Sequence, residues 1–108
     1  MRVLLDECID EGLRHAFSSH ECQTSRYAKL KGLKNGVLLI AAETAGFDVL
    51  VTVDKNLPYQ QNLSGRTIAV VILEVRKTTL DDLLKLMPDV LSALPKLKPG
   101  QVLRMQSP

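Results

Sequence analysis

The chain has 108 residues, of which 45% are hydrophobic and 24% are charged. A chain of this length and composition is expected to form a single domain, residues 1–108, with a core large enough to fold without disulfide staples. Lys and Arg exceed Asp and Glu by a net charge of only +2, too small a surplus to indicate general attraction to nucleic acid or anionic membranes. Any such partner must therefore be recognised locally.

The sequence carries no sign of a membrane or an oxidising compartment. The N-terminus has only a short apolar run before Asp6 and Glu7, and no stretch approaches the roughly 20 apolar residues of a membrane span. We therefore expect a cytoplasmic protein with no membrane partner. Cys8 and Cys22 are expected to be free, mostly buried thiols, and the cysteines and histidines lack the spacing of a structural zinc site.

The first half of the chain predicts two strands and two helices. Residues 2–5 form a short apolar run, typical of a strand buried on both faces. Asp10 is a suitable N-cap for a helix that follows it. Residues 21–25 indicate a second, weaker strand. Residues 37–45 are rich in helix formers and are followed by Gly46, which predicts a helix ending there.

The chain then continues with two further apolar strands. Residues 49–53 carry no charge and lead directly into Asp54, as expected of a buried strand that ends at a polar edge. Residues 55–65 contain Pro58, Gly65, two Asn and two Gln, which favours a loop or a short turn of helix. Residues 67–73 (TIAVVIL) predict the clearest buried strand of the chain.

The last third predicts a helix and a strand. Thr79 is a suitable N-cap for an apolar stripe at helical spacing that continues to Leu94. Pro88 lies within this stripe and is expected to kink or loosen the helix. Residues 102–105 then predict a short final strand.

Strands that alternate with helices predict an α/β fold, with a mainly parallel sheet of about five strands covered on both sides. In such a sheet the first strand commonly lies between the second and the third, and ligands bind outside the carboxyl ends of the strands at that point. Asp6 and Asp54 end the first and third strands. Because neighbouring strands lie about 4.8 Å apart, the two carboxylates could share one cation.

These acids suggest a site for a hard divalent cation. Asp6 and Asp54 are the candidate metal ligands, with Glu7 as a third candidate, and such an oxygen-rich set suits Mg²⁺ or Mn²⁺. A cation of this kind can activate water and neutralise charge on a scissile phosphodiester, so the three acids are also the candidate catalytic residues. The alternative is that the acids only cap turns and solvate the strand ends.

Residues 26–34, which precede the helix at residues 37–45, form a basic segment. It contains Arg26, Lys29, Lys31 and Lys34, and no acid occurs between Cys22 and Ala42. We expect this segment to hold a polyanion beside the acids, and polar residues 59–62 to add hydrogen-bonding groups past Asp54. The alternative is a solvated, charged loop. The candidate nucleic-acid-binding residues are Arg26, Lys29, Lys31, Lys34, Asn35, Lys55 and Asn56.

Three motifs, LLDE at residues 4–7, GLKNGVLL at 32–39 and VTVDKNLPYQQNL at 51–63, resemble the DUF5615 group of PIN-like proteins. The resemblance covers nearly the whole chain, and DKNLPYQQNL is its most specific part. It implies a compact three-layer α/β/α PIN-like fold and, by relation to VapC-like PIN toxins, a metal-dependent ribonuclease in a toxin-antitoxin pair. The implied partners are an RNA substrate and a small antitoxin with a DNA-binding helical module, and a homodimer is a further hypothesis.

The family's acids at the first strand and after the TxD strand correspond to Asp6 and Asp54. Many PIN-like relatives place another acid just before the central helix, where this chain has Asn35, and Glu43 lies about two turns further along. A site with fewer carboxylates is expected to hold its metal more weakly, because each anionic ligand that is lost removes attraction for the dication.

The remaining polar residues near this site are given supporting roles. Asn35 and Asn56 are expected to orient water or phosphate, and Lys34 or Lys55 to contact the RNA backbone. The alternative function is a catalytically weak PIN-like binding module that acts through an antitoxin or through self-association. A phosphate-binding regulatory domain of flavodoxin-like build fits less well, because the chain has no clear phosphate-accepting Asp and switch Lys.

Overall fold

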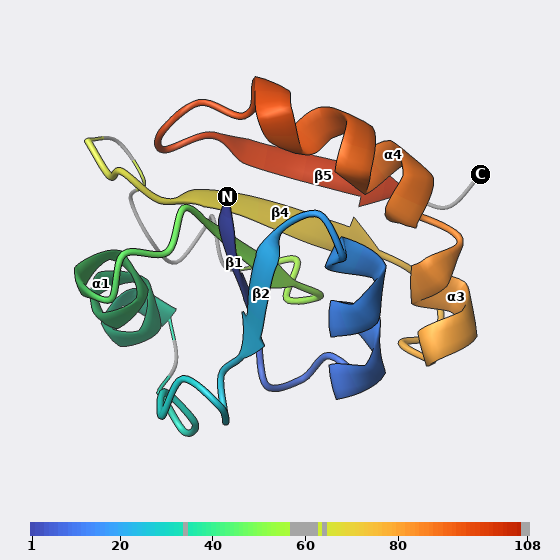
Figure 1. The fold of residues 1–108 in the computed structure, drawn as a ribbon, viewed down its shortest axis with the longest axis horizontal. Helices are drawn as coiled ribbons and strands as arrows, with labels where there is room; N and C mark the ends of the chain where they lie inside the picture. Colours follow the sequence, from blue (N-terminus) through green and yellow to red (C-terminus); the bar gives the residue numbers. More distant parts are fainter. Residues whose placement is uncertain (34, 57–62, 64, 107–108) are drawn as a thin grey trace.

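The fold was determined as a computed structural model that describes residues 1–33, 35–56, 63 and 65–106. Its strands are β1 (Arg2–Leu5), β2 (Glu21–Thr24), β3 (Val49–Thr52), β4 (Ala69–Glu74) and β5 (Val102–Gln106). They form one sheet in the order β2-β1-β3-β4-β5, and each neighbouring pair is parallel (Figure 1). The predicted α/β class with a mainly parallel sheet of about five strands is confirmed, and β1 lies between β2 and β3 as expected.

The helices divide between the two faces of this sheet. They are η1 (Glu11–Phe17, a 3₁₀ helix), α1 (Asn35–Thr44), α3 (Leu80–Leu84), α4 (Met87–Ala93) and η2 (Leu94–Lys96, also 3₁₀). In Figure 1, α1 lies on one side of the strands, whereas η1, α3 and α4 lie on the other. Within the described ranges, no helix is long and apolar enough to cross a membrane.

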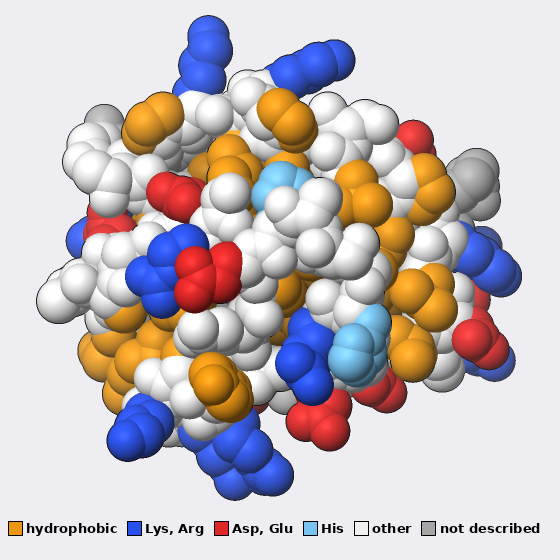
Figure 2. Space-filling view, viewed as in Figure 1, with side chains coloured by type: hydrophobic (Ala, Val, Ile, Leu, Met, Phe, Trp, Pro, Cys, Tyr) orange, Lys and Arg blue, Asp and Glu red, His pale blue; other side chains and the backbone are white. Residues whose placement is uncertain are grey.

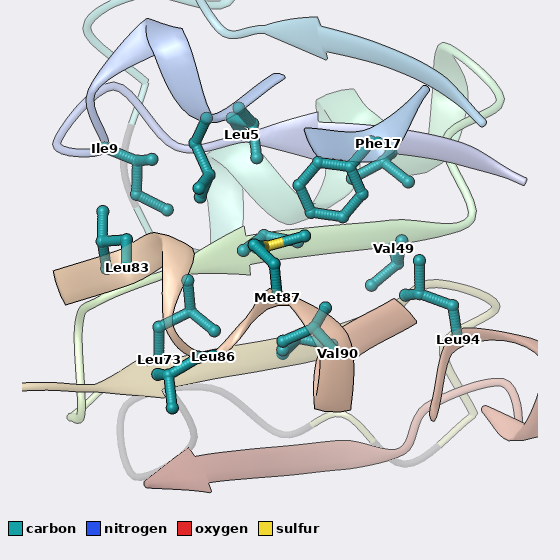
Figure 3. Close-up of a cluster of buried hydrophobic side chains, with 14 of the residues drawn as sticks. Leu5, Ile9, Phe17, Val49, Leu73, Leu83, Leu86, Met87, Val90 and Leu94 are labelled. Atoms are coloured by element: carbon teal, nitrogen blue, oxygen red, sulfur yellow. The ribbon is translucent and has the colours of Figure 1, made fainter. Parts of the chain in front are cut away.

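The face toward η1, α3 and α4 carries the larger apolar cluster. Side chains alternate along a strand, so Leu5 of β1 and Val49 of β3 point to this side together. Phe17 of η1 and Met87 of α4 complete the cluster, and Figure 3 shows Met87 amid the labelled side chains. This packing holds the helices against the sheet. The polar groups lie at the ends of the strands, outside the cluster.

The opposite face packs against α1. Leu4 and Leu50 are fully buried there with Leu38, Leu39 and Ala42 of the helix. The sheet is therefore apolar on both sides, which explains why its central strands are continuous hydrophobic runs without alternating polar residues. The finer PIN-like, three-layer description stays a prediction.

The single kinked helix expected after Thr79 is instead two helices, α3 and α4. Thr79 is the N-cap of α3, where its hydroxyl accepts from the Asp82 N–H at 3.4 Å, as predicted. Pro88, however, lies in the first turn of α4. A proline there loses no helical hydrogen bond, so Pro88 begins a helix and does not kink one.

Two other helix boundaries follow the local signals in the sequence. Gly46 has φ of 86°, a left-handed conformation that suits glycine, and it follows α1 as expected. The helix begins at Asn35, before the predicted start at residue 37. Asp10 caps η1 by accepting from the Gly12 N–H at 2.8 Å, although the helix it caps is 3₁₀ and not α.

Candidate functional site

The predicted acids lie at the carboxyl edge of the sheet, where all five parallel strands end. Asp6 directly follows β1, and its N–H donates to the Val51 carbonyl at 3.0 Å, which extends the pairing of β1 with β3 by one residue. Asp54 lies two residues beyond the end of β3. Both side chains are partly buried, so each acid meets solvent at the edge of a buried strand.

The Thr52 hydroxyl connects the two acid-bearing loops. It is fully buried, donates to Oδ2 of Asp6 at 2.7 Å and accepts from the Asp54 N–H at 3.1 Å. A hydroxyl bond to a carboxylate at this distance is charge-assisted and strong. Sequence reasoning missed Thr52, although it is the one hydroxyl in an apolar strand and lies two residues before Asp54.

Each acid also fastens its own turn. Oδ1 of Asp6 accepts from the Glu7 N–H at 2.8 Å, and Oδ1 of Asp54 accepts from the Asn56 N–H at 2.9 Å. The second of these is the local side-chain bond typical of Asp in turns. The turn role considered from sequence is therefore present, and it holds the carboxylates in defined orientations.

Glu7 has a different role from the other two acids. It is exposed, and its Oε2 accepts from the Gly32 N–H at 3.0 Å. This bond links the turn after β1 to the basic segment that precedes α1. In the part of the chain that the structure describes, no three His, Cys, Asp or Glu side chains are grouped so that they could hold a metal ion.

The donor chemistry of Asp6 and Asp54 is nevertheless compatible with a cation that keeps most of its water. A carboxylate oxygen has two lone pairs, so accepting one hydrogen bond leaves a further acceptor position on the same oxygen. Mg²⁺ and Mn²⁺ prefer such hard oxygen ligands, and Mg²⁺ commonly binds through one or two carboxylates plus waters and substrate phosphates. The donor chemistry of this pair thus suits the predicted cation.

The surface charge is mixed, as the net charge suggested. On the face drawn in Figure 2, Lys and Arg side chains are interspersed with Asp and Glu side chains and with hydrophobic ones. That face therefore presents no continuous basic surface. On that face, a polyanion could be attracted only by smaller groups of cations.

One such group lies in a hollow beside the acids. A cavity of about 370 Å³ contains two cations of the basic segment and three acids, and is lined by Asp6, Glu7, Ile9, Glu11, Thr24, Arg26 and Lys31. Two of the predicted nucleic-acid-binding residues therefore line the same cavity as the acid that follows β1, and their role in binding stays a prediction.

The other residues of the basic segment are less well connected to this hollow. Lys29 is exposed and has φ of 63°, in a tight turn between β2 and α1. Asn35 is the first residue of α1. Lys34 and residues 59–62, which were also predicted to bind nucleic acid or support the site, lie outside the described residues.

The turn after β3 carries the last predicted binding residues. Lys55 and Asn56 are both exposed and follow Asp54 directly. Lys55 lines a second cavity, of about 810 Å³, which it shares with residues that follow β4. Arg26 and Lys31 therefore line one hollow at this edge of the sheet, and Lys55 lines the other.

Glu43 is occupied elsewhere and is no substitute for the acid missing at Asn35. Its Oε1 accepts from Arg66 at 2.9 Å, and its Oε2 accepts from the Thr67 N–H at 2.8 Å. Burial favours a higher pKa, but the hydrogen bonds from Thr67 and Arg66 together hold the pKa of Glu43 below its usual value. Since Thr67 precedes β4, Glu43 lies at the amino edge of the sheet, opposite the candidate site.

Cys8 is a second residue near the site that sequence reasoning missed. Burial of its thiol and the negative charge of Asp6 raise the pKa of Cys8, while hydrogen bonds with Val53 and Thr52 lower it, and the net pKa is above the ordinary value. The thiol is therefore protonated at neutral pH and is no activated nucleophile. Both cysteines are free, as predicted, but the expectation that both are mostly buried is wrong for Cys8, which is exposed as a residue.

Comparisons of the chain with protein-family models, with curated proteins and with solved structures found no match. Membership of the DUF5615 group of PIN-like proteins therefore stays a prediction that rests on the sequence motifs.

Proposed function

We propose that this protein is a metal-dependent RNA endonuclease, the PIN-like toxin of a toxin-antitoxin pair, acting in the cytoplasm. The observation that carries the proposal is the hydrogen-bonded connection of Asp6 to the Asp54 loop through Thr52, at the point between β1 and β3 where ligands bind in such sheets. The hollow that joins Asp6 to Arg26 and Lys31 supports it, because a phosphodiester substrate needs cations beside the acids.

The residues would divide the work as follows. Asp6 and Asp54 hold Mg²⁺ or Mn²⁺, which when bound lowers the pKa of water and stabilises charge on the phosphate. Thr52 keeps the Asp6 carboxylate in one orientation. Arg26 and Lys31 attract the RNA backbone. The supporting roles predicted for Glu7, Lys29, Lys34, Asn35, Lys55 and Asn56 belong to this same proposal.

Cleavage of a mixed panel of RNA oligonucleotides with added Mn²⁺ tests this function. We expect Asp6→Asn and Asp54→Asn to reduce the cleavage rate at least about a hundredfold, because charge stabilisation by the metal is worth several kcal/mol. Glu21→Gln is the matched control, since it removes one negative charge from an exposed side chain at the opposite edge of the sheet. Cleavage that is equally fast in all three variants would refute the proposal.

A second candidate function is a binding module that pairs with an antitoxin or with itself. It is favoured by the bonds from Asp6 and Asp54 to their own turns, because such bonds give both acids a purely structural use. The binding module predicts no heat of Mn²⁺ binding by calorimetry and co-purification with a small helical DNA-binding protein encoded next to it. A homodimer predicts a doubled mass by light scattering, and a monomeric mass would exclude it.

A further inference from the structure

Whereas the hollow with Arg26 lies beside β1 and β2, a second hollow at the carboxyl edge of the sheet follows β3 and β4. This cavity, of about 810 Å³, is lined by Lys55, Glu74, Val75, Arg76, Lys77, Asp82 and Gln106. The lining residues come from the turn after β3, the carboxyl ends of β4 and β5, and the first turn of α3. In the strand order this cavity lies next to the acids that follow β1 and β3. Neither Asp6 nor Asp54 is among its described lining residues.

The two acids in this cavity are already neutralised by neighbours. Glu74 accepts from Arg104 at 2.7 Å and from Gln106 at 2.8 Å, and these bonds hold the pKa of its carboxyl below the usual range. Asp82 accepts from the Thr79 hydroxyl at 2.9 Å and lies 3.6 Å from the Lys85 ammonium. Neither carboxylate is left to repel an anion strongly.

The cations of the cavity are, in contrast, available. Arg76 and Lys77 are exposed, and neither side chain has a hydrogen bond or ion pair with any residue in the described part of the chain. Lys55 is exposed too and adds a third positive charge near Glu74. Among the described lining residues, Val75 is the one apolar side chain and none is aromatic, so the described lining suits a phosphate chain better than a base or nucleoside.

We propose that this cavity is a second subsite for the backbone of single-stranded RNA, contacted by Lys55, Arg76 and Lys77. The inference rests on the proposed function for its choice of RNA as the polyanion. In the strand order, cations lie beside β2, the acids follow β1 and β3, and the new cations follow β3 and β4. A single-stranded RNA bound along this edge of the sheet would meet positive charge on both sides of the phosphodiester to be cut.

The subsite is tested by the binding of a fluorescent single-stranded RNA oligonucleotide at several salt concentrations, with a chelator present to prevent cleavage. The variant is Arg76→Gln with Lys77→Gln. Its matched control is Lys96→Gln with Lys98→Gln, which removes the same charge from exposed residues at the amino edge of the sheet. Thermal unfolding of both proteins checks that they are folded.

We expect the slope of log affinity against log salt to become shallower by about 1.4 in the Arg76 and Lys77 variant, because each lost phosphate contact on a single strand contributes about 0.7. The control should keep the wild-type slope. Equal slopes in the two variants, or no binding by the wild-type protein, would overturn the subsite. If the wild-type protein binds RNA and the slope changes as expected, but Mn²⁺ supports no cleavage, the subsite is supported and the proposed catalysis is refuted. If the variant cleaves RNA with an unchanged KM, the proposed catalysis is supported and the subsite is refuted.

Discussion

A single buried hydroxyl connects the two acid-bearing turns of this protein. Thr52 donates to the Asp6 carboxylate and accepts from the Asp54 backbone, so the positions of both acids depend on one side chain that itself never meets solvent. In the proposed metal site Thr52 would orient a ligand, and losing such a supporting group typically costs about 10- to 100-fold in metal affinity or activity.

Replacing Thr52 by valine keeps the shape of the side chain and removes the hydroxyl. We expect a loss of about 1–3 kcal/mol in the free energy of unfolding, because the Asp54 N–H loses its buried acceptor. RNA cleavage should fall about 10- to 100-fold, the usual effect of losing a residue that orients a metal ligand. Urea unfolding and initial rates measure the two effects. Thr52→Ser should restore most of the cleavage, and failure to do so would assign the effect to packing.

The rate at which the Cys22 thiol reacts should depend on pH in a predictable way. Burial raises the pKa of this thiol to about 11, and the charge of Arg14 lowers it only in part. At pH 8 roughly one thiol in a thousand is then ionised, so a disulfide-exchange reagent should label Cys22 slowly in a Cys8→Ser variant, and faster by about tenfold per pH unit. Labelling at pH 8 as fast as in the urea-unfolded chain would contradict this.

The same pKa also affects stability. A thiol in the unfolded chain ionises near pH 8.5, whereas the folded one ionises near 11. The unfolded state therefore binds fewer protons in this window, and the contribution of Cys22 is complete below about pH 8.5 and lost as the pH rises toward 11.

Among the elements, α1 is attached to the sheet in two ways. Its apolar side packs on Leu4 and Leu50, while Glu43 near its last turn is bonded to Arg66 and Thr67 before β4. This arrangement fixes where the start of α1 lies relative to the candidate site. Glu43 is thus a structural residue at the far edge of the sheet.

Glu43→Gln should destabilise the protein by about 1.5–3 kcal/mol at pH 7, because it weakens hydrogen bonds made to a charged carboxylate. The folded pKa of Glu43 is below its usual value, so its contribution is present above about pH 4.3 and is lost as the pH falls through the folded value. Urea unfolding of wild type and variant should therefore differ at pH 7 and converge in acid. A difference independent of pH would refute the role of the charge.

For the whole molecule, the parallel sheet decides where charge gathers. All five strands end at the same edge of the sheet. Asp6 and Asp54 follow the neighbouring strands β1 and β3, and cations lie on either side of them. A divalent cation bound between the acids would then stabilise the entire fold, since the unfolded chain has no such site.

Thermal unfolding with and without Mn²⁺ tests this without any RNA. At a Mn²⁺ concentration a hundredfold above the dissociation constant, the folded state should gain about 2.7 kcal/mol, seen as a higher Tm. Asp54→Asn should lose most of this gain and Glu21→Gln should keep it. An equal rise in Tm for both variants would place the bound metal elsewhere.

The sequence by itself determined the elements of this protein and the ends at which its acids lie. Strand β1 and the N-caps Asp10 and Thr79 were predictable, because apolar runs and capping side chains act over a few neighbouring residues. The position of Asp6 and Asp54 on adjacent strands also followed, since alternating strands and helices leave few arrangements of a parallel sheet. The break between α3 and α4, which places Pro88 in the first turn of α4, was not predictable from the sequence. Tertiary packing determines whether a proline kinks a helix or lies at the start of a new one.

Only the tertiary structure decided which groups are engaged and which are available. The bond from Thr52 to Asp6 joins residues 46 apart in sequence, and the bond from Glu43 to Thr67 joins residues 24 apart. Arg76 and Lys77 became candidates only when Glu74 and Asp82 were found to be bonded to other residues. Such facts depend on strand register and on competition among donors, and a linear pattern records neither.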